Sequence, residues 1–251
     1  AAEYNATEMM VIAAAREIKD RILSHQYKTV LAGAGTANLA AWVAKYQLQK
    51  EDYNVELMVE LGYYGNSPRP AEPFVLNFGN FPTCKMLTET IDTIGVFTCG
   101  TTNRCIGVLG GGQVDKFGNI NSTMVSKDVY LTGSGGANDI ASGAREVVLV
   151  MQQSRVRFLE KVPYITAPGA RVSTLVSTMG VFEKLGDGEE FTLTKYLANP
   201  DFSSEEEAIK SIKENCGWDV RVSENLKRVG PPTLEELRLL RVFDPQKYYI
   251  R

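Results

Sequence analysis

The stretch from residue 29 to residue 59 constrains the fold of this chain most strongly. Thr29–Ala32 is a short apolar strand that leads into the loop Gly33-Ala-Gly35, and a helical stretch follows at Leu39–Tyr46. A further apolar strand spans Val55–Val59. A strand, a glycine loop, a helix and a second strand form a βαβ-like unit, in which the strands pair in parallel. The sequence therefore predicts the α/β class, with an open, mostly parallel sheet flanked by helices.

The rest of the chain fits one domain. Residues Thr7–Leu23 carry apolar side chains at helical spacing, and Asn5 or Thr7 can cap that helix. Further strands are expected at Ile106–Leu109, Val129–Thr132, Val147–Met151 and Val172–Val181. The tail is expected to return to helices, one of which begins around Thr233. The 251 residues show no internal repeat and no linker, so residues 1–251 are expected to form a single domain.

Charge and hydropathy exclude two classes of partner. The formal net charge is −3, so the chain lacks the excess of basic residues that is typical of nucleic-acid-binding proteins. No apolar run reaches the roughly 20 residues that cross a bilayer, which argues against a membrane partner. The first ten residues lack a charged-then-apolar signal pattern. We therefore expect a cytoplasmic protein.

The numbers and spacing of histidine and cysteine limit which residue types can carry catalysis or bind a metal. The chain has one histidine, His25, so a multi-histidine metal site is excluded, and His25 is expected to be a solvated residue near a helix end. The four cysteines lack the C-x-x-C spacing of zinc or redox sites and are expected to be reduced thiols. Catalysis must then come from carboxylates, backbone amides or a cofactor.

Glu60 is the carboxylate that stands out. It ends the apolar run Val55–Val59 and is followed by Leu61-Gly62. A carboxylate at the end of a buried strand is costly unless it is exposed at the sheet edge or kept for function. Ligands of α/β sheets bind at the carboxyl ends of the strands. Glu60 is therefore a candidate catalytic residue, and a rim residue paired with an arginine such as Arg69 is the alternative.

Three glycine-rich loops could supply backbone amides. Gly33-Ala-Gly35 could cradle a phosphate or a thioester, although a plain tight turn explains it equally well. Gly110-Gly-Gly112-Gln113 allows close backbone approach, and a hairpin with a bulge is the equal alternative. Thr132-Gly-Ser-Gly-Gly-Ala-Asn138 could aim free amides at a developing oxyanion. Each loop alone is ambiguous.

Taken together, the motifs resemble class I (family I) coenzyme A-transferases, and most closely the β subunit of the glutaconate type. The resemblance rests on Val59-Glu60-Leu-Gly62, on Leu109-Gly-Gly-Gly-Gln-Val-Asp115 and on the loop at Thr132–Asn138. These motifs occur in the family's order and spacing. Further similarity runs through Tyr164-Ile-Thr-Ala-Pro-Gly169, so that nearly the whole chain is covered.

The resemblance implies a mechanism, a fold and a partner. It implies the CoA-transferase fold and matches Glu60 to the nucleophile, which forms a mixed anhydride and then a glutamyl-CoA thioester. It implies no bound cofactor or metal, with coenzyme A as a co-substrate alongside an acyl-CoA and a carboxylic acid. A homologous α subunit, in a heterodimer or a larger heteromer, is expected beside it. The resemblance also matches the amides around Gly135, Gly136 and Ala137 to the loop that supports the oxyanion and the thioester. The full set of candidate oxyanion and CoA-binding residues is Gly33, Gly35, Gly111, Gly112, Gln113, Gly135, Gly136, Ala137 and Asn138.

The nucleophile motif departs from the family in one respect. Many members carry Ser-Glu-Asn-Gly and glutaconate-type subunits carry Glu-Ser-Gly, whereas here Leu61 and the aromatic pair Tyr63-Tyr64 follow Glu60. A bulkier and more aromatic pocket is expected. The alternative function is a CoA-thioester hydrolase or ring-cleaving C–C hydrolase of the same fold. Ser223-Glu-Asn225 imitates the motif in the tail and is interpreted as structural.

Overall fold

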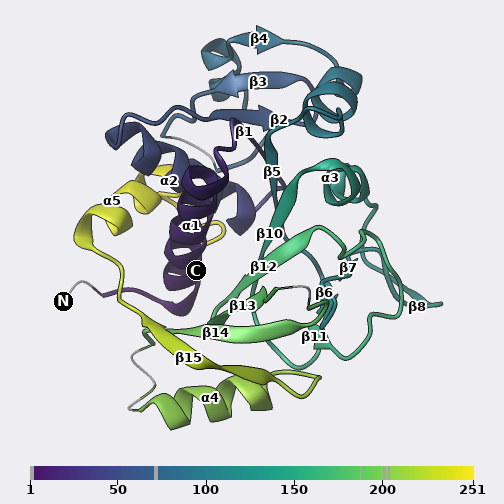
Figure 1. Cartoon of the computed structure of the whole chain (residues 1–251). Coiled ribbons are helices and arrows are strands. Elements are labelled where there is room, and N and C mark those ends of the chain that lie inside the picture. The colour runs from purple at the N-terminus through teal and green to yellow at the C-terminus, as the bar shows by residue number, and fades with distance from the viewer. Residues whose placement is uncertain (1–2, 71–72, 187, 200–201, 203) are drawn as a thin grey trace.

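One large sheet with helices on both faces dominates the protein (Figure 1). The computed structural model describes residues 3–70, 73–186, 188–199, 202 and 204–251. Within these residues the strand order of the large sheet is β15-β14-β13-β12-β10-β5-β1-β2-β3-β4. In chain order the strands are Thr29–Ala32 (β1), Glu56–Val59 (β2), Tyr63–Asn66 (β3), Met86–Leu87 (β4), Cys105–Leu109 (β5), Glu146–Met151 (β10), Val172–Ser177 (β12), Gly180–Lys184 (β13), Phe191–Leu197 (β14) and Arg221–Val229 (β15).

The middle of this sheet is parallel, and the predicted α/β class is confirmed. Strands β2, β1, β5, β10 and β12 lie side by side, each parallel to its neighbour. The flanks turn antiparallel through β3 and β4 on one side and through β13 and β14 on the other. Parallel strands bring their carboxyl ends to one edge, so the loops after β1, β2 and β5 are neighbours there.

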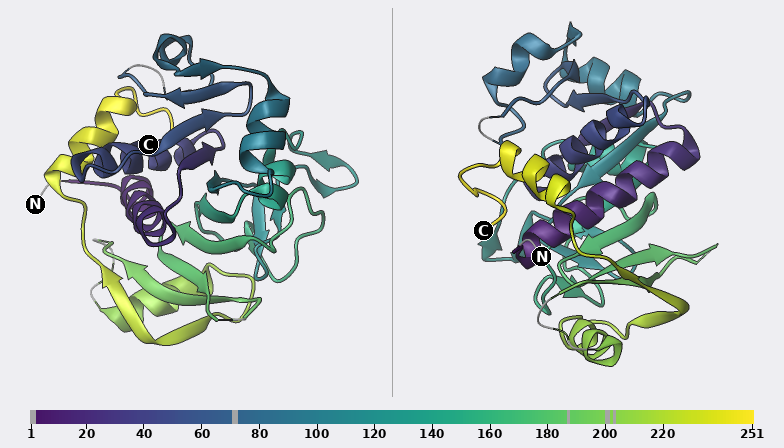
Figure 2. Two further views of the ribbon diagram at one scale, coloured as in Figure 1. Left: turned by 45° about the horizontal axis from the view of Figure 1, so that its top comes forward. Right: turned by 90° about the vertical axis from the view of Figure 1, so that its left-hand side faces the viewer.

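Alternation along the strands builds a hydrophobic core on each face of the sheet. In β1, Val30 and Ala32 join one core and Leu31 joins the other. Three helices cover the first face and gather together in both views of Figure 2. The helices are α1 (Ala6–His25), α2 (Thr36–Lys50), α3 (Ala137–Gly143), α4 (Glu205–Glu214) and α5 (Leu234–Phe243), of which α1, α2 and α5 form that layer.

The second face carries smaller elements. Ile140 of α3 packs into the second core, and so do residues of a three-stranded sheet with the order β11-β6-β7. The remaining elements are β6 (Gln113–Asp115), β7 (Ile120–Asn121), β8 (Met124–Ser126), β9 (Val129–Tyr130), β11 (Phe158–Leu159), the 3-10 helix η1 (Phe78–Thr83) and the π-helix η2 (Ile91–Thr98). Strands β8 and β9 form a separate ribbon.

Side-chain caps define where two helices begin. The Asn5 side chain accepts from the amide of Glu8 at 2.8 Å, and the Glu8 carboxylate accepts from the Asn5 amide in return. Thr233 and Glu236 form the same capping box at the start of α5. These boxes satisfy amides that otherwise lack a partner, so they fix the first turn. Asn5 is therefore the cap of α1, and the predicted start of α5 is confirmed.

Three expectations differ from the structure, and one segment contains elements that were not predicted. Val172–Val181 is two antiparallel strands, because the chain turns between Ser177 and Gly180. The strand expected at Val129–Thr132 shortens to β9 in the small ribbon. The tail holds β15 between its helices, where half-exposed polar residues pair with β14. The segment between β2 and β5 holds β3, β4, η1 and η2, which the sequence pattern did not predict.

No helix in the described part of the chain has the length and apolar character needed to span a membrane.

Candidate active site

Glu60 lies in a tight turn directly after β2. The Gly62 amide donates to the Val59 carbonyl at 3.0 Å, which closes the turn around Glu60 and Leu61. Gly62 has a φ of +106°, and a Cβ there would stand 1.9 Å from the Thr88 carbonyl oxygen. Only glycine fits both the dihedral angle and the space. The turn thus holds Glu60 half-buried at the carboxyl edge of the sheet.

The Glu60 carboxylate meets the loop that precedes α3. The Gly136 amide donates to Oε2 of Glu60 at 3.2 Å. A Cβ on residue 136 would lie 2.4 Å from the same oxygen, so glycine permits this approach. Among the described residues Glu60 has no ion-pair partner, and the alternative of a pair with Arg69 is therefore wrong. An unpaired carboxylate with one amide donor keeps an oxygen available to attack an electrophile.

The π-helix η2 holds the backbone of Glu60. The buried Thr93 hydroxyl donates to the Glu60 carbonyl at 2.8 Å, and the Thr98 hydroxyl donates to the Thr93 carbonyl at 2.8 Å. Ile94 of the same helix would lie 3.1 Å from a Cβ on residue 136, so it packs at the loop that contacts Glu60. π-helices are rare and are frequent at functional sites. Sequence analysis missed η2, although the threonines within an apolar run were a signal of an anchored segment.

Replacing Thr93 with valine is expected to lower the free energy of unfolding by about 1 kcal/mol, because the valine keeps the volume but cannot donate to Glu60. Chemical denaturation of the two proteins measures this. The matched control is Thr90→Val, because the Thr90 side chain is exposed and does not cap η2; a change within about 0.5 kcal/mol is expected there. Equal stability of the Thr93 variant and the natural protein would show that the hydrogen bond from Thr93 to Glu60 does not stabilise the fold.

The third glycine loop is the one that the fold brings to Glu60. A Cβ on Gly135 would lie 4.0 Å from Oε1 of Glu60, so both Gly135 and Gly136 border the carboxylate. The Ala137 amide already donates to the Ser134 carbonyl at 3.2 Å. Asn138 is exposed on the first turn of α3. Gly136 is therefore the backbone donor seen at the carboxylate, and Gly135 is its exposed neighbour.

The first glycine loop lies after β1, which is the neighbour of β2. The Gly33 amide donates to the Val108 carbonyl at 2.8 Å and so extends the pairing of β1 with β5. Gly35 caps the start of α2, and a Cβ there would touch the ring of Tyr249 at 3.9 Å. This loop shares the carboxyl edge of the sheet with Glu60, but the Gly33 amide is already used.

The second glycine loop builds the small sheet. A Cβ on Gly111 would lie 2.5 Å from Ile120, and a Cβ on Gly112 would lie 3.0 Å from the Asn121 carbonyl oxygen. The Gln113 side chain donates to the Val156 carbonyl at 3.1 Å and accepts from Asn121 at 2.9 Å. These contacts form the hairpin of β6 and β7, and none of them involves Glu60.

The aromatic pair after Glu60 packs against aromatic rings of η1 and η2. Tyr63 lies edge-to-face against Phe81 with ring centroids 5.6 Å apart, and Tyr64 lies 5.1 Å from Phe97. Leu61 is 53% exposed. The tyrosine rings thus brace η1 and η2, and Ile94 of η2 is an apolar side chain that packs at the Gly136 loop.

Within the described residues, no group of three or more histidine, cysteine, aspartate or glutamate side chains could hold a metal ion. The four cysteines are free thiols. His25 is the exposed last residue of α1, as its position predicts.

Comparison with known proteins identifies the family. The family model described as Coenzyme A transferase matches residues 94–185. The β subunit of 3-oxoadipate CoA-transferase from Pseudomonas knackmussii is 30% identical, over 96% of this chain and 94% of the relative. The chain belongs to the coenzyme A transferase family. Within that family it is a chain of the β-subunit type, and its enzyme class is that of transferases of CoA groups.

Solved structures agree with this family in fold. The β subunit of glutaconate CoA-transferase from Acidaminococcus fermentans is 27% identical over 99% of this chain and 96% of the relative. The crystal structure of that enzyme superposes with a TM-score of 0.83, at 24% identity, over 99% of this chain and 98% of the other. The decarboxylase AibA/AibB has a TM-score of 0.76 at 24% identity and 98% coverage of both chains. The CoA-transferase fold is therefore confirmed.

Proposed function

We propose that this chain is the β subunit of a heteromeric CoA-transferase that moves CoA between an acyl-CoA and a carboxylic acid through a glutamyl-CoA thioester on Glu60. The observation that carries the proposal is the unpaired Glu60 carboxylate at the carboxyl edge of the sheet, 3.2 Å from the Gly136 amide. The likeness to the β subunits of two CoA-transferases supports it.

The proposed reaction proceeds by acyl exchange on one carboxylate. A Glu60 oxygen attacks the thioester carbonyl, and the C–S bond breaks to release CoA thiolate and leave a mixed anhydride. The thiolate then attacks the Glu60 carbonyl carbon and expels the first carboxylate, which gives the glutamyl-CoA thioester. An incoming carboxylate attacks the same carbon and expels CoA thiolate, which leaves a second mixed anhydride. The thiolate then attacks the new acyl carbonyl and releases the new acyl-CoA. Glu60 ends as a free carboxylate, so atoms and charges balance.

The Gly136 amide has two roles in this sequence. Its hydrogen bond orients the resting carboxylate. When the Glu60 carbonyl is attacked, negative charge develops on its oxygen, and a fixed amide at 3.2 Å can stabilise that charge. Gly135, Ala137 and Asn138 complete the loop, and we assign the loop to the oxyanion and the thioester. Gly33, Gly35, Gly111, Gly112 and Gln113 remain candidates for CoA contacts.

A homologous α subunit is proposed to cover the surface around Glu60. Six large apolar side chains are at least 46% exposed on the turn, on η2 and on the chain from β9 into the third glycine loop. They are Leu61, Ile91, Val96, Val129, Tyr130 and Leu131. Contiguous apolar exposure marks an interaction site, and a partner there would enclose the carboxylate and exclude water.

The alternative is a hydrolase acting on a CoA-linked substrate. The shared fold with a decarboxylase shows that this architecture hosts other chemistry. The presence of Glu60 favours transfer, because the proposed transfer requires a carboxylate nucleophile whereas hydrolysis requires an activated water.

The proposal is tested by incubating the co-expressed α and β subunits with a panel of acyl-CoAs. Intact mass spectrometry is expected to detect a CoA adduct on this chain, and peptide mapping is expected to place it on Glu60. Thioester consumption without an adduct and without any acceptor acid would favour the hydrolase instead.

Glu60→Asp is expected to slow transfer by about 10²-fold and to increase the share of thioester lost to water, because the shorter side chain withdraws from the Gly136 amide. Transfer and hydrolysis are measured in parallel with one acyl-CoA. An unchanged ratio of the two rates would contradict the expected role of carboxylate position.

A further inference from the structure

A cavity opens at the edge of the sheet opposite to Glu60. Its volume is about 830 Å³, which is within the range of small-molecule sites. It lies where β10 and β12 begin and where β13 and α1 end. The polar side chains that carry the argument are Arg21, Arg145, Glu146, Arg171, Ser173 and Lys184.

This cavity is separate from the Glu60 site. Glu146 is the first residue of β10, whereas Glu60 follows the last residue of the parallel strand β2. Strands of four to six residues span about 13–20 Å, and the parallel strands between the two edges are buried. A molecule in the cavity therefore does not touch the catalytic carboxylate.

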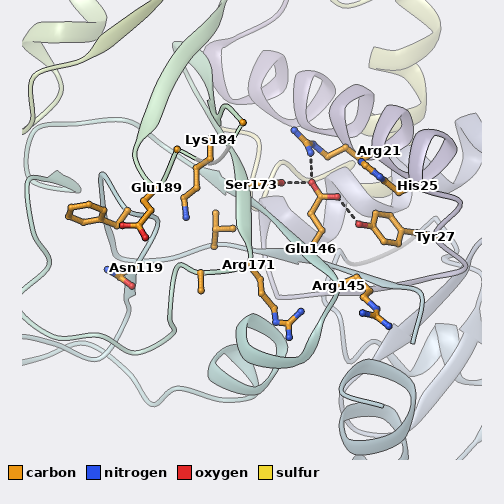
Figure 3. Close-up of a pocket in the computed structure, with 15 residues that line it drawn as sticks. Arg21, His25, Tyr27, Asn119, Arg145, Glu146, Arg171, Ser173, Lys184 and Glu189 are labelled. Atoms are coloured by element: carbon orange, nitrogen blue, oxygen red, sulfur yellow. Dashed lines mark hydrogen bonds and ion pairs between the residues drawn. The ribbon is translucent and has the colours of Figure 1, made fainter. Parts of the chain in front are cut away.

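One carboxylate in the cavity is fully engaged. Glu146 forms an ion pair with Arg21 and accepts hydrogen bonds from Ser173 and from the Tyr27 hydroxyl, the latter at 2.9 Å (Figure 3). Burial and the Glu146 charge raise the pKa of Tyr27, so the phenol remains a proton donor. Arg21 also pairs with Glu183. The carboxylates of this cluster therefore already have partners, and the cluster forms one wall.

Three other cations lack such a carboxylate. Arg145 donates to the carbonyls of Asn103 and Thr101 at 3.0 and 2.5 Å. Lys184 donates to the Gly169 carbonyl at 2.7 Å. Arg171 is exposed. Among the described residues none of the three has an ion pair within 4.0 Å.

Arg145 and Arg171 line two neighbouring cavities. Figure 3 shows both guanidinium groups directed away from the Glu146 cluster. Both also line an adjoining cavity of about 450 Å³ beside α3, together with Asn103 and Ser142. Besides Glu146, two acidic residues line these cavities. Glu189 lines the first cavity, and Asp139 lines the second. Position 187, two residues before Glu189, lies outside the described residues. The arginines therefore concentrate positive charge where the cavities join.

We propose that this basic cavity binds a small organic polyanion that carries two or more phosphate or carboxylate groups. Arginine presents planar donors that match both kinds of oxyanion, and Arg145 is already held in place by two carbonyls. Lys184 supplies a third cation on the first cavity. Lys184 lines the first cavity only, whereas Arg145 and Arg171 line both cavities, so a ligand with several anionic groups can engage all three cations.

The test is isothermal titration calorimetry of the full-length chain at constant ionic strength. Inorganic pyrophosphate probes the phosphate source of the ligand, and citrate probes the carboxylate source. Saturable binding of at least one probe is expected, and Arg171→Gln and Arg145→Gln are each expected to weaken it about tenfold or more. Arg171 is exposed, so its replacement leaves folding intact.

The matched control is Lys210→Gln, an exposed lysine of α4 outside both cavities, for which unchanged affinity is expected. Glu60→Ala is also expected to bind the probe normally, which keeps this proposal independent of the transferase mechanism. Absence of saturable binding by either probe at millimolar concentration overturns the proposal. Equal weakening by Lys210→Gln and Arg171→Gln overturns it too, because the binding would then follow net charge alone.

Discussion

Alanine in place of Glu60 is expected to reduce CoA exchange by at least about 10³-fold while the assembled enzyme stays intact, because the variant has no carboxylate to form the anhydride or the thioester. The turn around residue 60 is closed by the backbone of Val59 and Gly62, and the Thr93 hydroxyl binds the residue 60 carbonyl. These contacts do not use the lost side chain, so folding is expected to persist. The rate is measured with the purified heteromer and a matched acyl donor and acceptor.

A matched control lies in the tail of the same chain. Glu224 is an exposed residue of β15 within Ser223-Glu-Asn225, which imitates the family's nucleophile motif. Glu224→Ala is expected to exchange CoA at the natural rate. Near-normal exchange by a correctly assembled Glu60→Ala enzyme would refute the covalent mechanism, and a large loss in the Glu224 variant would transfer the role to that position.

Gly136→Ala is expected to lower the exchange rate by about 10²-fold although Glu60 is retained. The added Cβ would lie 2.4 Å from Oε2 of Glu60, so the carboxylate must move away from the amide that orients it. Displacement of a reacting group by about 1 Å typically lowers a rate by that factor, and the loss of an oxyanion donor adds to it. Steady-state kinetics and the yield of the CoA adduct both report the effect.

Gly133→Ala in the same loop is the control, because a Cβ there would meet only the Tyr130 hydroxyl, at an ordinary 3.6 Å. It is expected to leave exchange unchanged. If the two alanine variants exchange CoA at the same rate, the approach of Gly136 to Glu60 has no part in catalysis. A loss in both would assign the effect to the flexibility of the loop.

Local patterns were sufficient to predict the parallel centre of the fold. Apolar runs bounded by glycine identified β1, β2, β5 and β10, because a strand buried on both faces has a continuous apolar sequence. The flank of the sheet beyond β12 was harder to predict. β15 is half-exposed and polar, and its pairing with β14 is a long-range contact that no local pattern contains.

The site was predictable in part for the same reason. A carboxylate at the end of an apolar strand is a local signal, and it singled out Glu60. The residues alone left three glycine loops ambiguous, and the family resemblance pointed to the loop around Gly135, Gly136 and Ala137. The hydrogen bond from the Gly136 amide to the carboxylate depends on the tertiary structure. The hydrogen bond from Thr93 to the Glu60 carbonyl depends on the π-helix η2, which cannot be predicted from the periodicity of an α-helix. The basic cavity was also not foreseen, because Arg145 and Arg171 precede different strands.

The turn after β2 contains positions that do not tolerate substitution and one position that does. Gly62 is fixed by its dihedral angle and by the Thr88 carbonyl, and the backbone of Glu60 is fixed by Thr93. Leu61 lies between them with half of its side chain exposed. Within this turn, mutational tolerance is therefore concentrated at residue 61, one position from the proposed nucleophile. If the proposed mechanism holds, single substitutions at residue 61 are expected to change the surroundings of the acyl group while the geometry that keeps Glu60 in place is retained.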